Sequence, residues 1–165
     1  MMRSTLTGLV LLTGAAMTAC TQPAPSPPPA SITASVANAP ASPNRGHNFS
    51  TVTRGAKLFQ ENCAACHGAQ AEGAPNWQKP GADGKYPAPP LNGTAHAWHH
   101  PHSVLVRTIK DGTAKLGGSM PAWRDKLGDA DIDAIIAWFQ SMWPDELYAN
   151  WKRMDDESRG KARGS

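Results

Sequence analysis

The chain has 165 residues and a formal net charge of +3 at pH 7, from 16 lysines and arginines against 13 acidic residues. Such a nearly neutral balance argues against a nucleic-acid-binding protein. The sequence contains no internal repeat, so its length favours one small domain together with non-globular segments.

Residues 1–19 have the profile of an export signal. Arg3 gives a positive start, and a stretch of leucines and small residues, Thr5–Met17, follows it. This stretch is too short to span a membrane. Removal of the signal takes away Arg3 alone among the charged residues, which leaves 15 basic against 13 acidic residues and a net charge of +2.

Cys20 follows Met17-Thr18-Ala19, and this arrangement resembles the lipobox of bacterial lipoproteins. In such proteins the cysteine is acylated and becomes the mature N-terminus, so the resemblance predicts a lipid anchor on Cys20. Ordinary secretion with a free Cys20 thiol is the alternative. Because Thr21 is not the aspartate associated with inner-membrane retention, we expect the periplasmic side of the outer rather than the inner membrane.

Residues 20–45 form a predicted linker. Prolines recur through it between alanine, serine and threonine, and no apolar periodicity is present. Such a composition cannot bury a core, so we expect an extended, semi-rigid tether. The folded domain is predicted over residues 46–154, and a disordered tail over residues 155–165.

The most informative motif of the domain is Cys63-Ala64-Ala65-Cys66-His67. Two cysteines two residues apart, followed at once by histidine, form the pattern that attaches a c-type haem. The two thiols become thioethers on the vinyl groups of the porphyrin, and His67 supplies an imidazole nitrogen to the iron. A disulfide would not require the histidine, and a zinc site would need more ligands than the distant Cys20 could add.

The spacing of apolar residues predicts an all-α domain, without an alternating strand. We expect a first helix over Thr53–Cys66 and a second over Ser103–Lys110. The third opens at Gly128-Asp129. Its apolar residues recur at helical spacing: Ile132, Ile135, Ile136, Phe139 and Trp143. An amphipathic stretch, Asp145–Met154, follows a break at Pro144.

The region 53–143 resembles a class I c-type cytochrome, a family of small all-α electron carriers with one haem. In that family a glycine and an aromatic residue lie eight and four residues before the first haem cysteine, as Gly55 and Phe59 do here. An aliphatic and an aromatic residue of the C-terminal helix, here Ile135 and Trp138, pack against them. The resemblance implies three to five helices around one covalent haem.

The resemblance also implies supporting residues around the iron. A proline after the haem motif offers its carbonyl to the proximal imidazole; Pro90 is the candidate and Pro89 the alternative. A methionine in a glycine-rich loop, often followed by proline, supplies the sixth ligand, and Met120-Pro121 matches. Met142 and Met154 are rival ligands, and Met120 could instead be a packed loop residue.

A histidine cluster, His96–His102, precedes the second predicted helix, and the fold does not demand it. Its imidazoles are His96, His99, His100 and His102. One hypothesis is a surface copper or zinc site, and another is replacement of Met120 as the axial ligand. We favour a solvated loop, because neighbouring histidines without a carboxylate or thiol often bind no metal.

These features predict a periplasmic, membrane-tethered carrier of single electrons between redox protein partners. A catalytic haem would need a vacant iron position, which Met120 would fill. The sequence shows neither an acid–base or nucleophilic constellation nor a small-molecule substrate site. The alternatives are a haem subunit of an oxidoreductase complex and a metal-handling lipoprotein that uses the His96–His102 cluster.

Overall fold

The computed structural model describes residues 45–164. The predicted signal segment, Cys20 and all but the last residue of the predicted linker lie outside this range. Within it, helices are joined by turns and loops and no strand forms, which confirms the predicted all-α, class I cytochrome c fold. None of the helices in this range combines the length and the apolar character that crossing a bilayer requires.

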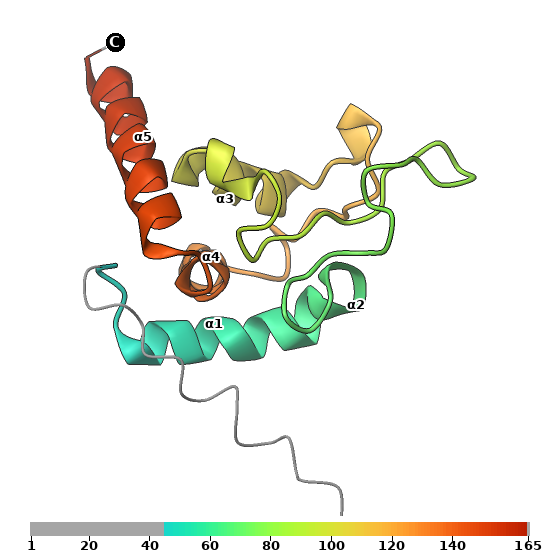
Figure 1. Ribbon diagram of the computed structural model, residues 1–165, viewed down its shortest axis with the longest axis horizontal. Helices are drawn as coiled ribbons and strands as arrows, with labels where there is room; N and C mark the ends of the chain where they lie inside the picture. Colours follow the sequence, from blue (N-terminus) through green and yellow to red (C-terminus); the bar gives the residue numbers. More distant parts are fainter. Residues whose placement is uncertain (1–44, 165) are drawn as a thin grey trace, which may run out of the picture. The chain divides into compact units, whose positions relative to one another are not determined.

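Five α-helices and two short 3-10 helices make up the described region (Figure 1). They are α1 (Phe49–Asn62), α2 (Ala64–His67), η2 (Ala97–His99), α3 (His102–Asp111), η3 (Ala114–Leu116), α4 (Asp129–Ser141) and α5 (Asp145–Arg163). The first predicted helix is therefore two helices. It begins earlier than predicted, at Phe49, because the Asn48 side chain caps it by accepting the N–H of Thr51 at 2.8 Å.

The core forms where α1 crosses α4, which Figure 1 shows nearly end-on above α1. Gly55 makes the crossing close: a Cβ there would lie only 1.9 Å from the carbonyl oxygen of Ala134 and 2.9 Å from Cβ of Trp138. One turn later, the rings of Phe59 and Trp138 are 4.4 Å apart between centroids. Phe59 and Ile135 are both fully buried in this core.

The last helix, α5, continues to Arg163 rather than ending at Met154, so the tail predicted over residues 155–165 is wrong as far as Arg163. Its first half packs through Tyr148 and Trp151, whose rings lie 5.4 Å apart. Asp155 is also buried, and its carboxylate accepts the N–H of His102 at 2.8 Å. That contact caps α3, whose own N-cap residue, Pro101, has no side-chain acceptor.

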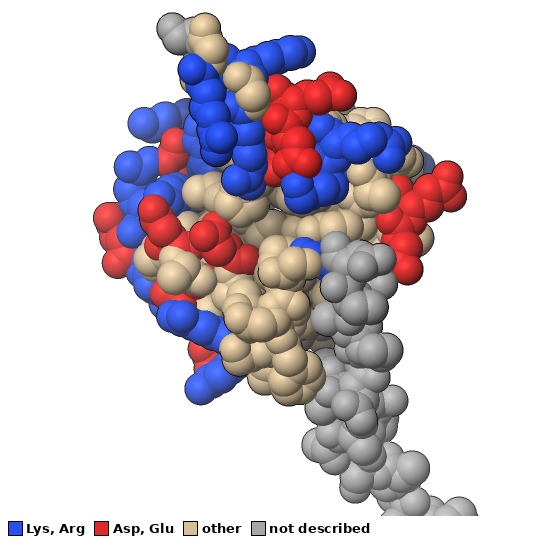
Figure 2. Space-filling model, turned by 90° about the vertical axis from the view of Figure 1, so that its left-hand side faces the viewer, with Lys and Arg blue, Asp and Glu red and all other residues tan. Residues whose placement is uncertain are grey.

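Charges of both signs are interleaved on the face that Figure 2 shows. On α5, Lys152 pairs with Asp156 and Arg159 pairs with Asp155, each one helical turn apart. Such i,i+4 pairs support a helix that has few apolar contacts in its second half.

Arg45 belongs to the folded domain, although it was predicted to be the last residue of the linker. Its guanidinium donates to the carbonyls of Gln140 and Trp143 at the end of α4, and to Asp145 Oδ1 at 2.8 Å. Its own carbonyl accepts the Tyr148 hydroxyl at 2.9 Å. These bonds occupy carbonyls that the end of α4 would otherwise leave unpaired, so Arg45 is a structural part of this end of α4.

Candidate haem site

The two cysteines and the histidine of the motif lie on one short turn. Cys63 ends α1, and its carbonyl accepts the N–H groups of Cys66 at 3.1 Å and of His67 at 3.0 Å. Both thiols are free; Cys66 is exposed and Cys63 is half-buried. Burial, with a smaller contribution from Cys66, raises the pKa of the Cys63 thiol to about 11. The coiled spacing presents two unpaired thiols beside an imidazole, as covalent haem attachment requires.

His67 is the only buried residue of α2, with 8 % of its surface exposed. Its Nδ1 donates to the carbonyl oxygen of Pro89 at 2.9 Å. Burial lowers the pKa of the imidazole, although the bond to Pro89 opposes that shift. With Nδ1 committed to the carbonyl, Nε2 is the ring nitrogen left to bind a metal.

The carbonyl acceptor is Pro89, not the favoured candidate Pro90. Gly73 lies against this pair of prolines: a Cβ on it would come within 2.5 Å of the Pro90 nitrogen and 2.8 Å of the Pro89 carbonyl carbon. Its φ of +78° is in the left-handed region that favours glycine. This close approach, together with the burial of Pro90, leaves the carbonyl of Pro89 facing the imidazole.

The segment after His67 turns back through main-chain bonds. The N–H of Gly73 donates to the carbonyl of His67 at 2.7 Å, and the N–H of Ala74 donates to the carbonyl of Ala88 at 2.8 Å. Leu91 then donates to the carbonyl of Ala71 at 2.8 Å. Residues 75–87 form a loop between these paired ends, so the chain returns Pro89 to His67 after a long excursion.

Met120 is partly buried and lies on the loop after η3. Its N–H donates to Thr113 Oγ1 at 3.1 Å, and its carbonyl accepts the N–H of Thr113 at 2.9 Å. A Cβ on Gly112 would lie 2.5 Å from the same carbonyl. The structure thus fixes the Met120 backbone at the end of α3. Thr113 was not predicted to support Met120, because it belongs to no recognisable motif of the sequence.

The histidines of the predicted cluster have separate surroundings. His96 lies between the Trp77 ring, 5.8 Å away, and the His100 ring, 5.7 Å away. His102 Nε2 is 3.1 Å from Asp133 Oδ1. Burial, followed by the nearby His96 and His99, lowers the pKa of His100. Across residues 45–164, no three histidine, cysteine or acidic side chains are arranged to hold a metal ion.

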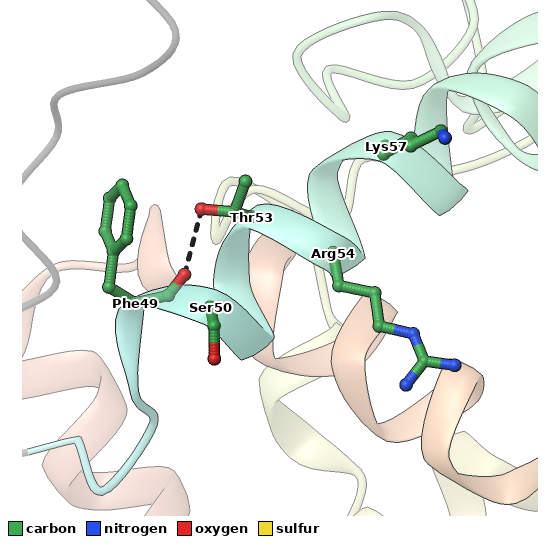
Figure 3. A pocket seen from close by; sticks show the side chains of 5 residues that line it. All are labelled: Phe49, Ser50, Thr53, Arg54 and Lys57. Atoms are coloured by element: carbon green, nitrogen blue, oxygen red, sulfur yellow. Dashed lines mark hydrogen bonds between the residues drawn. The ribbon is translucent and has the colours of Figure 1, made fainter.

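A shallow hollow on the outside of α1 is lined by Phe49, Ser50, Thr53, Arg54 and Lys57 (Figure 3). The Thr53 hydroxyl donates to the carbonyl of Phe49 at 2.9 Å, and the side chains point away from one another. Arg54 is paired with Asp131 on α4. The hollow therefore offers no convergent polar groups, and it contains no residue of the haem motif.

The residues present fit a covalent haem c. Two free thiols and an imidazole oriented by a carbonyl occupy one turn, and these are the groups that haem c uses for covalent attachment and for axial ligation. Partly buried apolar side chains border the core as well, among them Leu91, Ile109 and Trp123. Such side chains can pack against a flat apolar macrocycle. The macrocycle would then supply a part of the core that this small domain otherwise lacks.

Comparison with known proteins agrees with this geometry. Residues 50–139 match the family described as cytochrome c oxidase, cbb3-type, subunit III. The cbb3-type cytochrome c oxidase subunit CcoP of Azospirillum sp. (strain B510) is 37% identical over 91 residues, which are 55% of this chain and 28% of that protein. The FixP subunit of Bradyrhizobium sp. (strain ORS 278) is 35% identical over 53% of this chain and 26% of its own length.

A smaller relative is covered almost completely. Cytochrome c6 of Bryopsis maxima is 31% identical over 84 residues, which are 51% of this chain and 83% of that protein. This chain therefore spans about a quarter of the oxidase subunits it resembles but most of the cytochrome c6. No solved structure matches the chain significantly.

The family match covers more than half of the chain and includes α2, the Pro89 segment and most of α1 and α4. The same region holds the cysteine pair and the buried, carbonyl-bonded histidine. The protein belongs to the cbb3-type subunit III family of c-type cytochromes, with haem c as its cofactor.

Proposed function

We propose that the domain carries single electrons through a haem attached at Cys63 and Cys66 and ligated by His67 and Met120. The observation that carries this proposal is the His67 imidazole, buried and oriented by the Pro89 carbonyl beside two free thiols. When bound, the haem supplies a one-electron redox couple. His67 would supply the imidazole ligand of the iron, and a soft thioether from Met120 would favour the reduced state.

Membrane tethering through a lipid on Cys20 is part of the proposal. The described domain starts at Arg45, so a linker of 24 residues would join it to the acylated cysteine. A proline-rich chain of this length reaches roughly 30–70 Å. Such a tether lets the domain turn between a donor and an acceptor protein on the periplasmic side of a bacterial membrane.

A second candidate function is that of a haem subunit in an oxidoreductase complex. The names of the relatives favour it, since CcoP and FixP are subunits of cbb3-type cytochrome c oxidases. This chain matches only about a quarter of those subunits, whereas it matches most of the smaller cytochrome c6. We therefore place the single-domain carrier first.

The test begins with the full-length protein produced in a bacterium that attaches haem c. Haem should stay with the denatured chain through acid–acetone extraction, because thioethers do not dissociate. The ferric protein should show low-spin iron with the weak far-red sulfur-to-iron band, and the ferrous protein should bind carbon monoxide poorly. A five-coordinate, high-spin spectrum would contradict the proposed electron-carrier function. A bis-histidine spectrum would show that the sixth ligand comes from the His96–His102 cluster.

The two candidate functions predict different states of the protein in its own membrane: free or part of a complex. A carrier should be recovered as a free protein after mild detergent extraction and should exchange electrons with more than one partner. An oxidase subunit should co-purify with an oxidase in fixed stoichiometry. Recovery of the protein only within such a complex would overturn the first candidate in favour of the second.

A further inference from the structure

The carbonyl that orients His67 belongs to a segment without helical support of its own. Pro89 lies in the loop 88–93, between the loop of residues 75–87 and η2. This loop is held by main-chain bonds from Ala74 to the carbonyl of Ala88 at 2.8 Å, and from Leu91 to the carbonyl of Ala71 at 2.8 Å. The carbonyl of Leu91, two residues after Pro89, needs a partner from elsewhere in the fold.

Trp143 supplies that partner. It follows α4, only 1 % of its surface is exposed, and its indole N–H donates to the carbonyl of Leu91 at 2.8 Å. The ring also lies against Gly93, where a Cβ would come within 3.1 Å of Trp143 Cδ1 and where φ is +97°. The loop that carries Pro89 is therefore fastened by one hydrogen bond and one close contact to a rigid, fully buried indole.

We propose that Trp143 is a positioning residue that sets the strength of the His67–Pro89 hydrogen bond and thereby the reduction potential of the iron. This inference rests on the proposed function, because it takes His67 as the axial ligand. A firm bond from Nδ1 to a carbonyl makes the imidazole a stronger donor, and a stronger donor stabilises Fe(III). Loss of the Trp143 bond frees the loop, weakens the bond to His67 and raises the potential.

The fold offers a matched control in Trp151. Its surface is 4 % exposed, and its indole N–H donates to the carbonyl of His100, also at 2.8 Å. The two rings are neighbours, with centroids 5.9 Å apart, but His100 does not belong to the Pro89 loop. Trp151→Phe also removes an indole hydrogen bond from this pair of tryptophans, but it leaves the Pro89 loop untouched. It therefore measures any general effect of weakening the packing around the two rings.

The experiment compares Trp143→Phe, Trp151→Phe and wild type as full-length, haem-loaded proteins. Redox titration should give a higher potential for Trp143→Phe alone. NMR should show the His67 Nδ1–H exchanging with water severalfold faster in Trp143→Phe and at the wild-type rate in Trp151→Phe. Equal potentials and equal exchange in the two variants, whether shifted or not, would overturn the proposal.

A second variant guards against misfolding of Trp143→Phe. Replacement of Trp143 by benzothienylalanine keeps the bicyclic shape and replaces the N–H with sulfur, so the packing stays and the donor is lost. It should reproduce the upward shift in potential, and a wild-type potential would overturn the proposal. Failure of the proposed function is recognised separately, because the wild-type spectrum would then lack a histidine-ligated low-spin iron before any variant is compared.

Discussion

The side chain with the largest expected effect on the redox chemistry is Met120, whose backbone is fixed by two hydrogen bonds to Thr113. In Met120→Ala we expect the far-red band to disappear and the reduction potential to fall, since the soft donor that favours Fe(II) is gone. Affinity for carbon monoxide should rise roughly tenfold or more, the effect of losing ~1.4 kcal/mol of competition from an internal ligand. Optical spectra, redox titration and ligand titration measure these three changes.

Met142→Ala is the control for Met120→Ala, because Met142 is the partly buried methionine that follows α4. It should leave the band, the potential and the ligand affinity as they are, while thermal stability falls. If Met142→Ala removes the band and Met120→Ala does not, the sixth ligand has been assigned to the wrong methionine.

Single residues also mark how far the sequence determines the site. Cys63, Cys66 and His67 were predictable because a covalent attachment needs those groups at that spacing. The choice between Pro89 and Pro90 was not, because both prolines offer a carbonyl and only the direction of the chain decides which one faces the ring. Close packing of Gly73 against Pro90, and the indole of Trp143 on Leu91, set that direction through contacts distant in sequence.

Among the elements, α1 and α4 were predictable as a crossing pair, and Gly55 tests the crossing. Gly55→Leu should lower the free energy of unfolding by ~1–3 kcal/mol or more, because overpacking a close contact forces the helices apart. The Cβ atom of any replacement for Gly55 would by itself overlap the carbonyl oxygen of Ala134, which would lie 1.9 Å away. Chemical denaturation of the haem-loaded protein measures the loss.

Gly160→Leu is the matched control for Gly55→Leu. Gly160 is also helical, but a Cβ on it would meet nothing within 4 Å. Its replacement should leave stability unchanged or raise it, since glycine is a poor helix former. Equal losses in the two variants would show that the effect belongs to helix glycines in general rather than to the α1–α4 crossing.

The length of α5 was not predictable from apolar spacing. The amphipathic pattern ends at Met154, whereas the helix continues to Arg163. Beyond Met154 the helix is supported by pairs such as Arg159–Asp155 and by the bond from His102 to Asp155, which joins α5 to the start of α3. A pattern search detects neither, because the first has no apolar residue and the second links positions 53 residues apart.

Asp155 should therefore stabilise α3 from a distance. In Asp155→Ala the His102 N–H loses its acceptor at the end of a helix, and the unfolding free energy should fall by ~1–3 kcal/mol. Amide exchange should accelerate most in the first turn of α3, which hydrogen exchange resolves by residue. Asp156→Ala is the control: its carboxylate is half exposed and pairs with Lys152, so its loss should change stability by about 0.5 kcal/mol or less.

For the whole molecule, the bonds of Arg45 join the first described residue to the end of α4 and to α5. The guanidinium is fixed at the end of α4, and the Tyr148 hydroxyl on α5 holds the Arg45 carbonyl. The bonds of Arg45 and the turn that carries Cys63 and His67 are therefore contributed by different parts of the fold.

The tether itself is tested at Cys20. Mass spectrometry of the mature N-terminus should find a diacylglyceryl-modified Cys20, and the wild-type protein should sediment with membranes, because two acyl chains give stable anchoring whereas one is marginal. Cys20→Ser should release a haem-loaded, fully folded domain into the soluble fraction with an unchanged absorption spectrum, which separates loss of the anchor from loss of the fold. Outer-membrane markers should co-fractionate with the wild-type protein, as the Thr21 position predicts.

Two outcomes would contradict the lipid anchor. An unmodified mature N-terminus downstream of Cys20 would show that the signal is an ordinary secretory one. Membrane sedimentation of Cys20→Ser would show that something other than the acylated cysteine holds the protein there.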